Sequence, residues 1–218
     1  MKTFDPLITA LALFTALPLA AYAQPVCGSW ESIGGTVGGE IRDLVAFDDG
    51  TGVQLYMAGE FQSVQDPVLG VIEAQRLARW DGTSWSSLPG LEGFENRLDG
   101  RASELEVWDD GSCPALYVVG AFRQAAGLIA NGLVRWNGTE WSVLGDPATA
   151  GLLGTKGAIT AHDFGDGEKL YIGGSVFVPS SPRDRPDVWA WDGASWAPVA
   201  GASEDAGAIT LMSMGGDL

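Results

Sequence analysis

The sequence predicts an all-β protein built from a tandem repeat, and three observations support this prediction. Three Trp-marked segments are near copies of one another, at residues 78–85, 134–141 and 189–196. The second Trp of each copy belongs to a series with steps of 55, 56 and 55 residues, which indicates one repeated supersecondary unit: Trp30, Trp85, Trp141 and Trp196. The 218 residues include 31 Gly, 11 Pro and 9 Trp, which suits short strands and tight turns.

Each unit contains four pieces that we expect to be strands. The first is an apolar run that ends at an acidic turn, at residues 44–50, 105–111 and 161–167. The second is apolar on both faces, as expected of a strand covered on both sides, at residues 55–59, 116–120 and 170–174. The third ends at Trp80, Trp136 or Trp191, and the fourth ends at Leu88, Leu144 or Val199.

The third and fourth strands are joined by Asp-Gly or Asn-Gly, which tolerate the positive φ of tight hairpins. A two-residue loop would make Trp80 and Trp85 diagonal neighbours, and a four-residue loop would place them directly opposite. Either way both rings share one sheet face, so we interpret the repeated Trp residues as structural before considering a sugar-binding platform. These are Trp30, Trp80, Trp85, Trp136, Trp141, Trp191 and Trp196.

Four antiparallel strands in a repeated unit of about 50 residues are typical of a β-propeller blade. We expect complete blades at about 41–88, 102–144 and 158–199, with partial strands at 29–33 and 208–218. Because propellers close with four to eight blades, this set is incomplete. We expect a longer chain that supplies the remaining blades, closure by self-association, or a truncated gene.

The repeat resembles the kelch motif of galactose-oxidase-type propellers and related secreted bacterial propeller repeats. Residues 170–174 match its strand and double glycine, and Trp80-Asp81 with Trp85 matches its aromatic-Asp and Trp pair. Two units lack the first glycine of the pair, and Trp80 stands where kelch repeats usually have Tyr. The resemblance covers nearly all of residues 27–218 and implies a propeller fold.

The N-terminus is typical of a secretory signal peptide over residues 1–23. Lys2 precedes an uncharged stretch of 14 residues from Leu7 to Ala20, which is too short to span a bilayer. Ala21-Tyr22-Ala23 forms a cleavage site. We therefore expect a mature chain at 24–218 that is secreted or periplasmic and does not span a membrane after cleavage.

Charge and cysteine content narrow the expected partners. A net charge of −16 argues against nucleic-acid binding, because the phosphate backbone would be repelled. Cys27 and Cys113 would meet an oxidising compartment, so a disulfide is possible, although the expected blade order separates them.

Two surfaces are candidates for a binding site. The second-to-third and fourth-to-first connections are long and variable, which favours recognition on their face; examples are residues 62–75 and 124–131. The first strands are expected to line a central channel with acidic side chains. We take Asp43, Glu104 and Thr160 as equivalent positions, and likewise Val45, Glu106 and His162. No contiguous loop supplies calcium ligands, so we interpret the Asp-Asp-Gly segments as turns and expect no metal or cofactor.

The leading functional hypothesis is a secreted, non-catalytic scaffold that binds a protein or glycan partner. The sequence gives little support for catalysis, since a single His cannot build a His-based metal centre and no nucleophile elbow is present. One alternative is the N-terminal part of a glycan-active hydrolase or oxidase whose catalytic residues follow residue 218. Another is a purely structural repeat.

Overall fold

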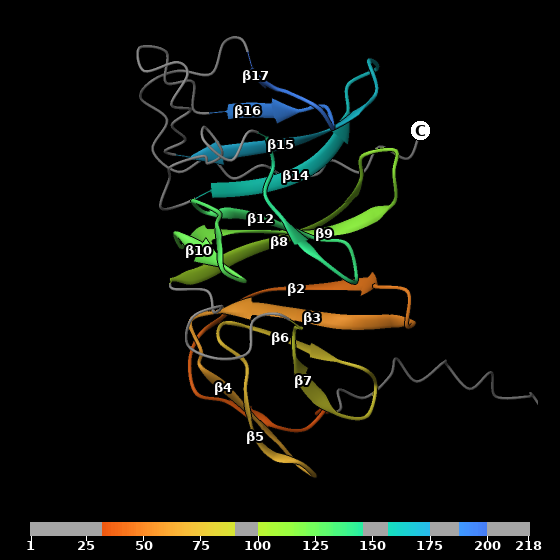
Figure 1. Cartoon of the computed structure of the whole chain (residues 1–218). Helices are drawn as coiled ribbons and strands as arrows, with labels where there is room; N and C mark the ends of the chain where they lie inside the picture. Colours follow the sequence, from red (N-terminus) through yellow and green to blue (C-terminus); the bar gives the residue numbers. More distant parts are fainter. Residues whose placement is uncertain (1–31, 90–99, 146–156, 175–187, 200–218) are drawn as a thin grey trace, which may run out of the picture. The chain divides into compact units, whose positions relative to one another are not determined.

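The structure is a computed structural model that describes residues 32–89, 100–145, 157–174 and 188–199 (Figure 1). All regular elements in these residues are β-strands, and every strand pair is antiparallel. The prediction of an all-β, antiparallel protein is therefore confirmed.

Three four-stranded sheets account for most of the strands, and each follows the chain as a meander. The first sheet contains β2 (Ile41–Asp48), β3 (Val53–Gly59), β6 (Leu77–Trp80) and β7 (Trp85–Ser87). The second contains β8 (Arg101–Asp109), β9 (Pro114–Ala121), β12 (Leu133–Trp136) and β13 (Trp141–Ser142). The third contains β14 (Gly157–Asp163), β15 (Glu168–Gly174), β16 (Val188–Trp191) and β17 (Trp196–Pro198).

The hairpin between the third and fourth strand of each sheet has a four-residue loop. Trp80 lies directly opposite Trp85, and the corresponding pairs in the other sheets have the same register. The paired rings have centroids 4.9–5.5 Å apart, within the range of favourable aromatic contacts. The first loop residue closes the turn in each case. Asp81, for example, accepts hydrogen bonds from the N–H groups of Thr83 and Ser84.

The acidic segments after the first strands act as turns, as interpreted from the sequence. Asp48 Oδ1 accepts hydrogen bonds from the N–H groups of Gly50 and Gly52, both of which have positive φ. Asp163 makes the same pair of bonds in the third sheet. Because the Asp side chain is short, its carboxylate can accept hydrogen bonds from the backbone two and four residues later, which stabilises a sharp reversal between strands.

Two connections that the sequence suggested to be loops contain strands instead. A three-stranded sheet is formed by β1 (Thr36–Val37), β4 (Ser63–Asp66) and β5 (Gly70–Glu73), and a small hairpin by β10 (Gln124–Ala125) and β11 (Leu128–Ile129). Asp66 Oδ1 stabilises the first hairpin by accepting the N–H groups of Val68 and Leu69. The long second-to-third connections expected at residues 62–75 and 124–131 therefore each contain a short hairpin.

Apolar side chains from successive sheets form shared cores. One cluster joins the first and second sheets and includes Tyr56, Leu105 and Trp136; a second joins the second and third sheets and includes Trp108, Ile159 and Trp191.

We call the face of a sheet that contacts the next sheet along the chain its outgoing face. The opposite face, which contacts the preceding sheet, is its incoming face. The incoming face of the first sheet is partly covered by β1 and β4 through Val37 and Val64.

The turn at Gly138 gives a direct test of the contact between the first two sheets. Gly138 and Gly82 have almost the same φ, +98° and +97°, but a Cβ on Gly138 would lie 2.3 Å from the carbonyl oxygen of Asp49. A Cβ on Gly82 would meet nothing within 4 Å. Gly82→Ala should cost about 1 kcal/mol of unfolding free energy for its φ alone. Gly138→Ala should cost a further 1–3 kcal/mol or so for the clash, measured by urea unfolding. Equal losses of unfolding free energy in the two variants would show that the turn at Gly138 is not packed against Asp49.

Candidate functional site

The acidic residues predicted to line a channel lie at the junctions between sheets, where they accept main-chain hydrogen bonds. Asp43 Oδ2 accepts the N–H of Leu105 at 2.7 Å, across from the first sheet to the second. From the second sheet to the third, Glu104 accepts the N–H of Ile159 at 3.0 Å and Glu106 that of Ala161 at 3.1 Å. Each carboxylate thus joins the first strand of one sheet to the first strand of the next.

Asp43 also lies close enough to Glu104 and Glu106 to affect their ionisation. Burial raises the pKa of Glu106 above its usual range, and the charges of Asp43, Glu168 and Glu104 raise it further, against the lowering effect of the Ala161 N–H. Burial likewise raises the pKa of Glu104. The structure therefore brings Asp43, Glu104 and Glu106 near one another, and the surroundings of Glu104 and Glu106 favour the protonated forms of these two residues more than water does.

The equivalence proposed for the third unit was wrong by two residues. Val45, Glu106 and Thr160 are each the strand partner of the Leu-Tyr tyrosine of their own unit, so these three positions correspond. By the same register Ala158 corresponds to Asp43. The error arose from aligning Asp166 with the acidic turns of the other units, whereas the turn of the third unit begins at Asp163.

His162 is therefore not part of the acidic group. By strand register it corresponds to the buried aromatic residues Phe47 and Trp108. Its ring lies 4.3 Å from the ring of Phe164, which in turn lies 5.3 Å from that of Tyr171. By the same register Phe164 occupies the position of Asp49 and Asp110 in the first two units.

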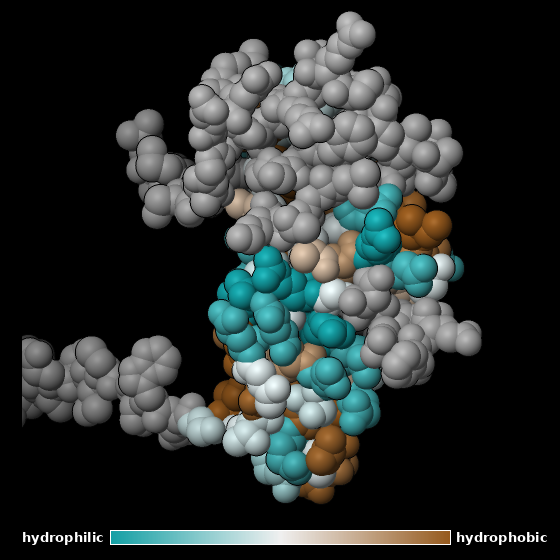
Figure 2. Space-filling view, turned by 90° about the vertical axis from the view of Figure 1, so that its left-hand side faces the viewer, coloured by the Kyte–Doolittle hydropathy of each residue, from teal (hydrophilic) through white to brown (hydrophobic). Residues whose placement is uncertain are grey.

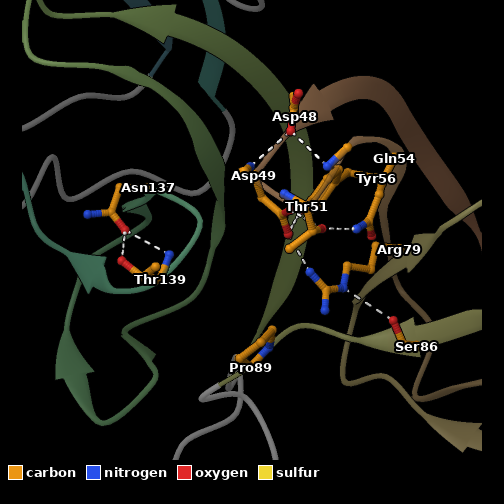
Figure 3. Close-up of polar contacts among 12 residues, drawn as sticks. Asp48, Asp49, Thr51, Gln54, Tyr56, Arg79, Ser86, Pro89, Asn137 and Thr139 are labelled. Carbon is orange, nitrogen blue, oxygen red and sulfur yellow. Dashed lines mark hydrogen bonds and ion pairs between the residues drawn. The ribbon is translucent and has the colours of Figure 1, made fainter.

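A buried ion pair on the outgoing face of the first sheet was not predicted from the sequence. The Arg79 guanidinium bonds to Asp49 Oδ2 and, through Nε, to Ser86 Oγ at 3.2 Å (Figure 3). Tyr56 donates its hydroxyl to the same Asp49 oxygen at 2.9 Å, and Thr51 bonds to the other. The Asp49 side chain is 1% exposed, so this charge depends on its partners.

The ionisation of the network follows from these contacts. Burial alone raises the pKa of Asp49, but hydrogen bonds from Thr51 and Tyr56 and the charge of Arg79 outweigh it and hold the pKa below its usual range. Burial and the bond to Asp49 raise the pKa of Tyr56 to about 12. Asp49 therefore contributes stability at neutral pH that is lost as the pH falls through its lowered pKa.

The second unit repeats this network and the third replaces it. Asp110 and Arg135 form the corresponding pair at 3.6 Å, with Arg135 Nε donating to the Tyr117 hydroxyl at 3.3 Å. In the third unit, Phe164 and Ala190 stand where the other units have Asp and Arg, beside Tyr171. Both charges are absent together, so neither member of the pair stands without its partner. Only an alignment of the three units that includes strand register reveals this joint replacement.

The repeated Trp residues are structural in the described residues. Trp85, Trp136 and Trp191 are at most 6% exposed. Trp141 donates its indole N–H to the carbonyl of Pro89 at 2.7 Å, and Trp85 donates to Gly34 at 3.3 Å, so each ties its sheet to the segment that precedes it. Trp30 lies outside the described residues. These positions support core packing in preference to a sugar platform.

Of the two cysteines, only Cys113 lies in the described residues. Cys113 is exposed, with Sγ 3.8 Å from an Arg135 nitrogen. Cys27 lies outside the described part of the chain, so a disulfide between them stays a prediction.

The described ranges hold no group of three His, Cys, Asp or Glu side chains placed to bind a metal ion. Nor do they contain a helix with the length and apolar character needed to cross a membrane.

The β4–β5 hairpin displays apolar side chains on a supported backbone. Val68, Leu69 and Val71 are 82%, 61% and 62% exposed. Asp66 accepts the N–H of Trp85 through Oδ2 at 2.9 Å while its other oxygen supports the hairpin tip. Apolar surface is visible at the lower end of Figure 2, at the level of this hairpin. The tip therefore lies beside the short turn before Trp85, away from the face suggested by the long connections.

The Asp49–Arg79 pair can be tested against the substitutions that the third unit already carries. Arg79→Ala should cost about 3–5 kcal/mol of unfolding free energy, because it leaves the Asp49 carboxylate buried without a cation. Asp49→Phe/Arg79→Ala, which copies the third unit, should recover a large part of that loss. A double-mutant cycle by urea unfolding measures the coupling. Additive effects of the two substitutions would contradict the assigned pair.

The raised pKa of Glu106 predicts a pH-dependent stability. A carboxyl group whose pKa is raised by folding favours the folded state at low pH, and this contribution is lost as the pH rises through the folded pKa. Glu106→Gln keeps an oxygen for the Ala161 N–H but removes the charge. The substitution should raise the melting temperature at pH 8 and change it little at pH 4. The exposed Glu140→Gln is the control, and an equal response of both variants would contradict the prediction.

Comparison with known proteins identifies no family for this chain. No family model, no curated protein and no solved structure matches it. The strongest likeness in the described residues is therefore internal. The three sheets share strand order, hairpin register and turn chemistry, and the kelch resemblance stays a hypothesis based on the repeated motif.

Proposed function

We propose that the chain is part of a β-propeller with kelch-like repeats and acts as a secreted, non-catalytic binding scaffold. Three features support the repeat architecture: a four-stranded meander in every unit, shared apolar cores between neighbours, and carboxylates that join the first strands. Such units bury apolar faces against their neighbours, which makes a rigid support for exposed connections.

The observation that carries the binding role is the β4–β5 hairpin tip. Exposed Val68 and Leu69 are adjacent in sequence, and the Asp66 carboxylate bonds to both of their N–H groups and to Trp85. Burial of an exposed Val or Leu side chain gains about 1.5–3 kcal/mol, and a tip ordered before binding loses little entropy on association. Aliphatic side chains without an exposed aromatic plane suit a protein partner better than a sugar ring.

Photo-crosslinking tests this proposal. A photoreactive amino acid in place of Leu69 in the mature chain should capture a specific protein from the extracellular fraction of the source organism. The same amino acid in place of Glu140, which is exposed in a turn of the second sheet, is the control. Val68→Ser in the Leu69 variant should reduce the yield by about tenfold, the effect of roughly 1.4 kcal/mol.

Three outcomes would contradict the proposal. Equal capture at both positions would mean that the tip has no special role. Binding to a glycan array that survives Val68→Ser would move the site to another surface and another ligand class. Absence of both protein and glycan binding would favour the purely structural repeat.

A further inference from the structure

The β4–β5 hairpin leaves one strand edge of its small sheet open. The strand order is β1, β4, β5, so among the described residues β5 has a hydrogen-bonded neighbour on one side only. Val71 and Glu73 alternate with Gly70 and Ile72 along β5, and their side chains are exposed on the same face. The hairpin therefore has an accessible strand edge next to its apolar tip.

The register of the hairpin shows which backbone groups face this edge. The N–H of Ala74 bonds to the carbonyl of Gln62 at 2.9 Å, so the backbone groups of Ala74 and, two residues earlier, of Ile72 face β4. The residues between them belong to non-hydrogen-bonded pairs, whose N–H and C=O groups point away from β4. The backbone groups of Val71 and Glu73 thus face outward, and the described part of the chain supplies no hydrogen-bond partner for them.

The corresponding hairpin of the second unit is shorter. β10 and β11 have two residues each, and the N–H of Ala130 bonds to the carbonyl of Arg123, so Ile129 is the one residue of β11 whose backbone groups face outward. Ile129 is 64% exposed and Val71 is 62% exposed. The two positions are thus matched in side-chain exposure, whereas β5 has two outward-facing residues and β11 has one.

The charges around β5 favour a basic ligand. Glu73 is exposed, and none of the ion pairs in the described residues includes it. The negative charge of Asp81 lies close enough to Asp66, at the base of the hairpin tip, to interact with it. A second copy of the chain would bring a net charge of −16 to this edge, whereas a basic segment would be attracted to it.

We propose that β5 binds an extended segment of a partner protein, which joins the small sheet as a further antiparallel strand and alternates basic with apolar residues. The backbone groups of its basic residues pair with those of Val71 and Glu73, a form of recognition known as strand addition. The basic residue opposite Glu73 compensates its charge, and the aliphatic stem of the next one covers Val71. This inference rests on the binding role proposed for the hairpin tip and specifies the partner's chemistry.

A synthetic hexapeptide of alternating Lys and Val, with blocked ends, tests the proposal on the mature chain. In amide NMR spectra, the peptide should protect the N–H groups of Val71 and Glu73 from hydrogen exchange, whereas the N–H of Ile72 is already bonded to β4. A peptide with Glu in place of Lys should bind about tenfold more weakly or less. Methylation of the Lys backbone nitrogens should abolish binding, and methylation of the Val nitrogens, which face away from β5, should leave it unchanged.

Three variants separate the backbone of β5 from its side chains. Val71→Pro removes an outward-facing N–H without breaking a bond to β4, and Pro is tolerated on a strand edge. It should weaken binding of the Lys-Val peptide about tenfold, as expected when one or two hydrogen bonds are lost. Val71→Thr keeps the N–H, and Ile129→Pro makes the same change in β11, so both should bind like the parent. The methylated peptides test the same contact if Val71→Pro does not fold.

Three results would overturn this inference. The first is equal binding of the Lys-Val peptide by the parent and by Val71→Pro. The second is equal weakening by Val71→Thr and Val71→Pro, which would assign binding to the side chain. The third is self-association of the parent in sedimentation experiments that Val71→Pro abolishes, which would identify a second copy as the occupant.

The photo-crosslinking experiment distinguishes failure of this inference from failure of the proposed function. Capture of a protein through position 69 that Val71→Pro does not reduce would keep the binding role of the tip and overturn strand addition. Capture that Val71→Pro reduces, and that Val71→Thr does not, would support both.

Discussion

Burial of one sheet's face against the next is the constraint on which the rest of this structure depends. A single four-stranded meander of short strands has apolar side chains on both faces and cannot cover both by itself. The shared clusters around Leu105 and Ile159 solve this problem at two junctions. At Leu44, where the described residues place no preceding sheet, the same pattern of residues leaves apolar surface exposed.

The polar groups of the junctions follow from that constraint. First strands of neighbouring sheets are too close to leave main-chain N–H groups in water, so Asp43, Glu104 and Glu106 accept them. Burying these acids near one another has a cost, which is visible in the raised pKa of Glu106. Asp49 differs from Glu106, because the Arg79 cation and several hydrogen bonds lower its pKa and keep the carboxylate charged.

The third unit shows that the junction chemistry is variable while the strand framework is kept. Phe164 and Ala190 replace the buried pair, and the aromatic contact with Tyr171 takes its place. A joint replacement of this kind is expected when the loss of one partner alone would leave a buried charge unpaired. The side chains on the outgoing face therefore differ between units that share the same strand order.

The sequence by itself determined the all-β class, the repeat length, the strand ends at Trp80, Trp136 and Trp191, and the role of the Asp-Gly segments as turns. These features depend on local chemistry, namely alternation of side chains and the φ preferences of Gly and Asp. Only the tertiary structure decided the four-residue hairpin loops, the β4–β5 hairpin and the Asp49–Arg79 pair. It also corrected the register that separates His162 from the acidic group. These features depend on which strands pair and in which register, and residues 30 positions apart, such as Asp49 and Arg79, meet only when that pairing is fixed.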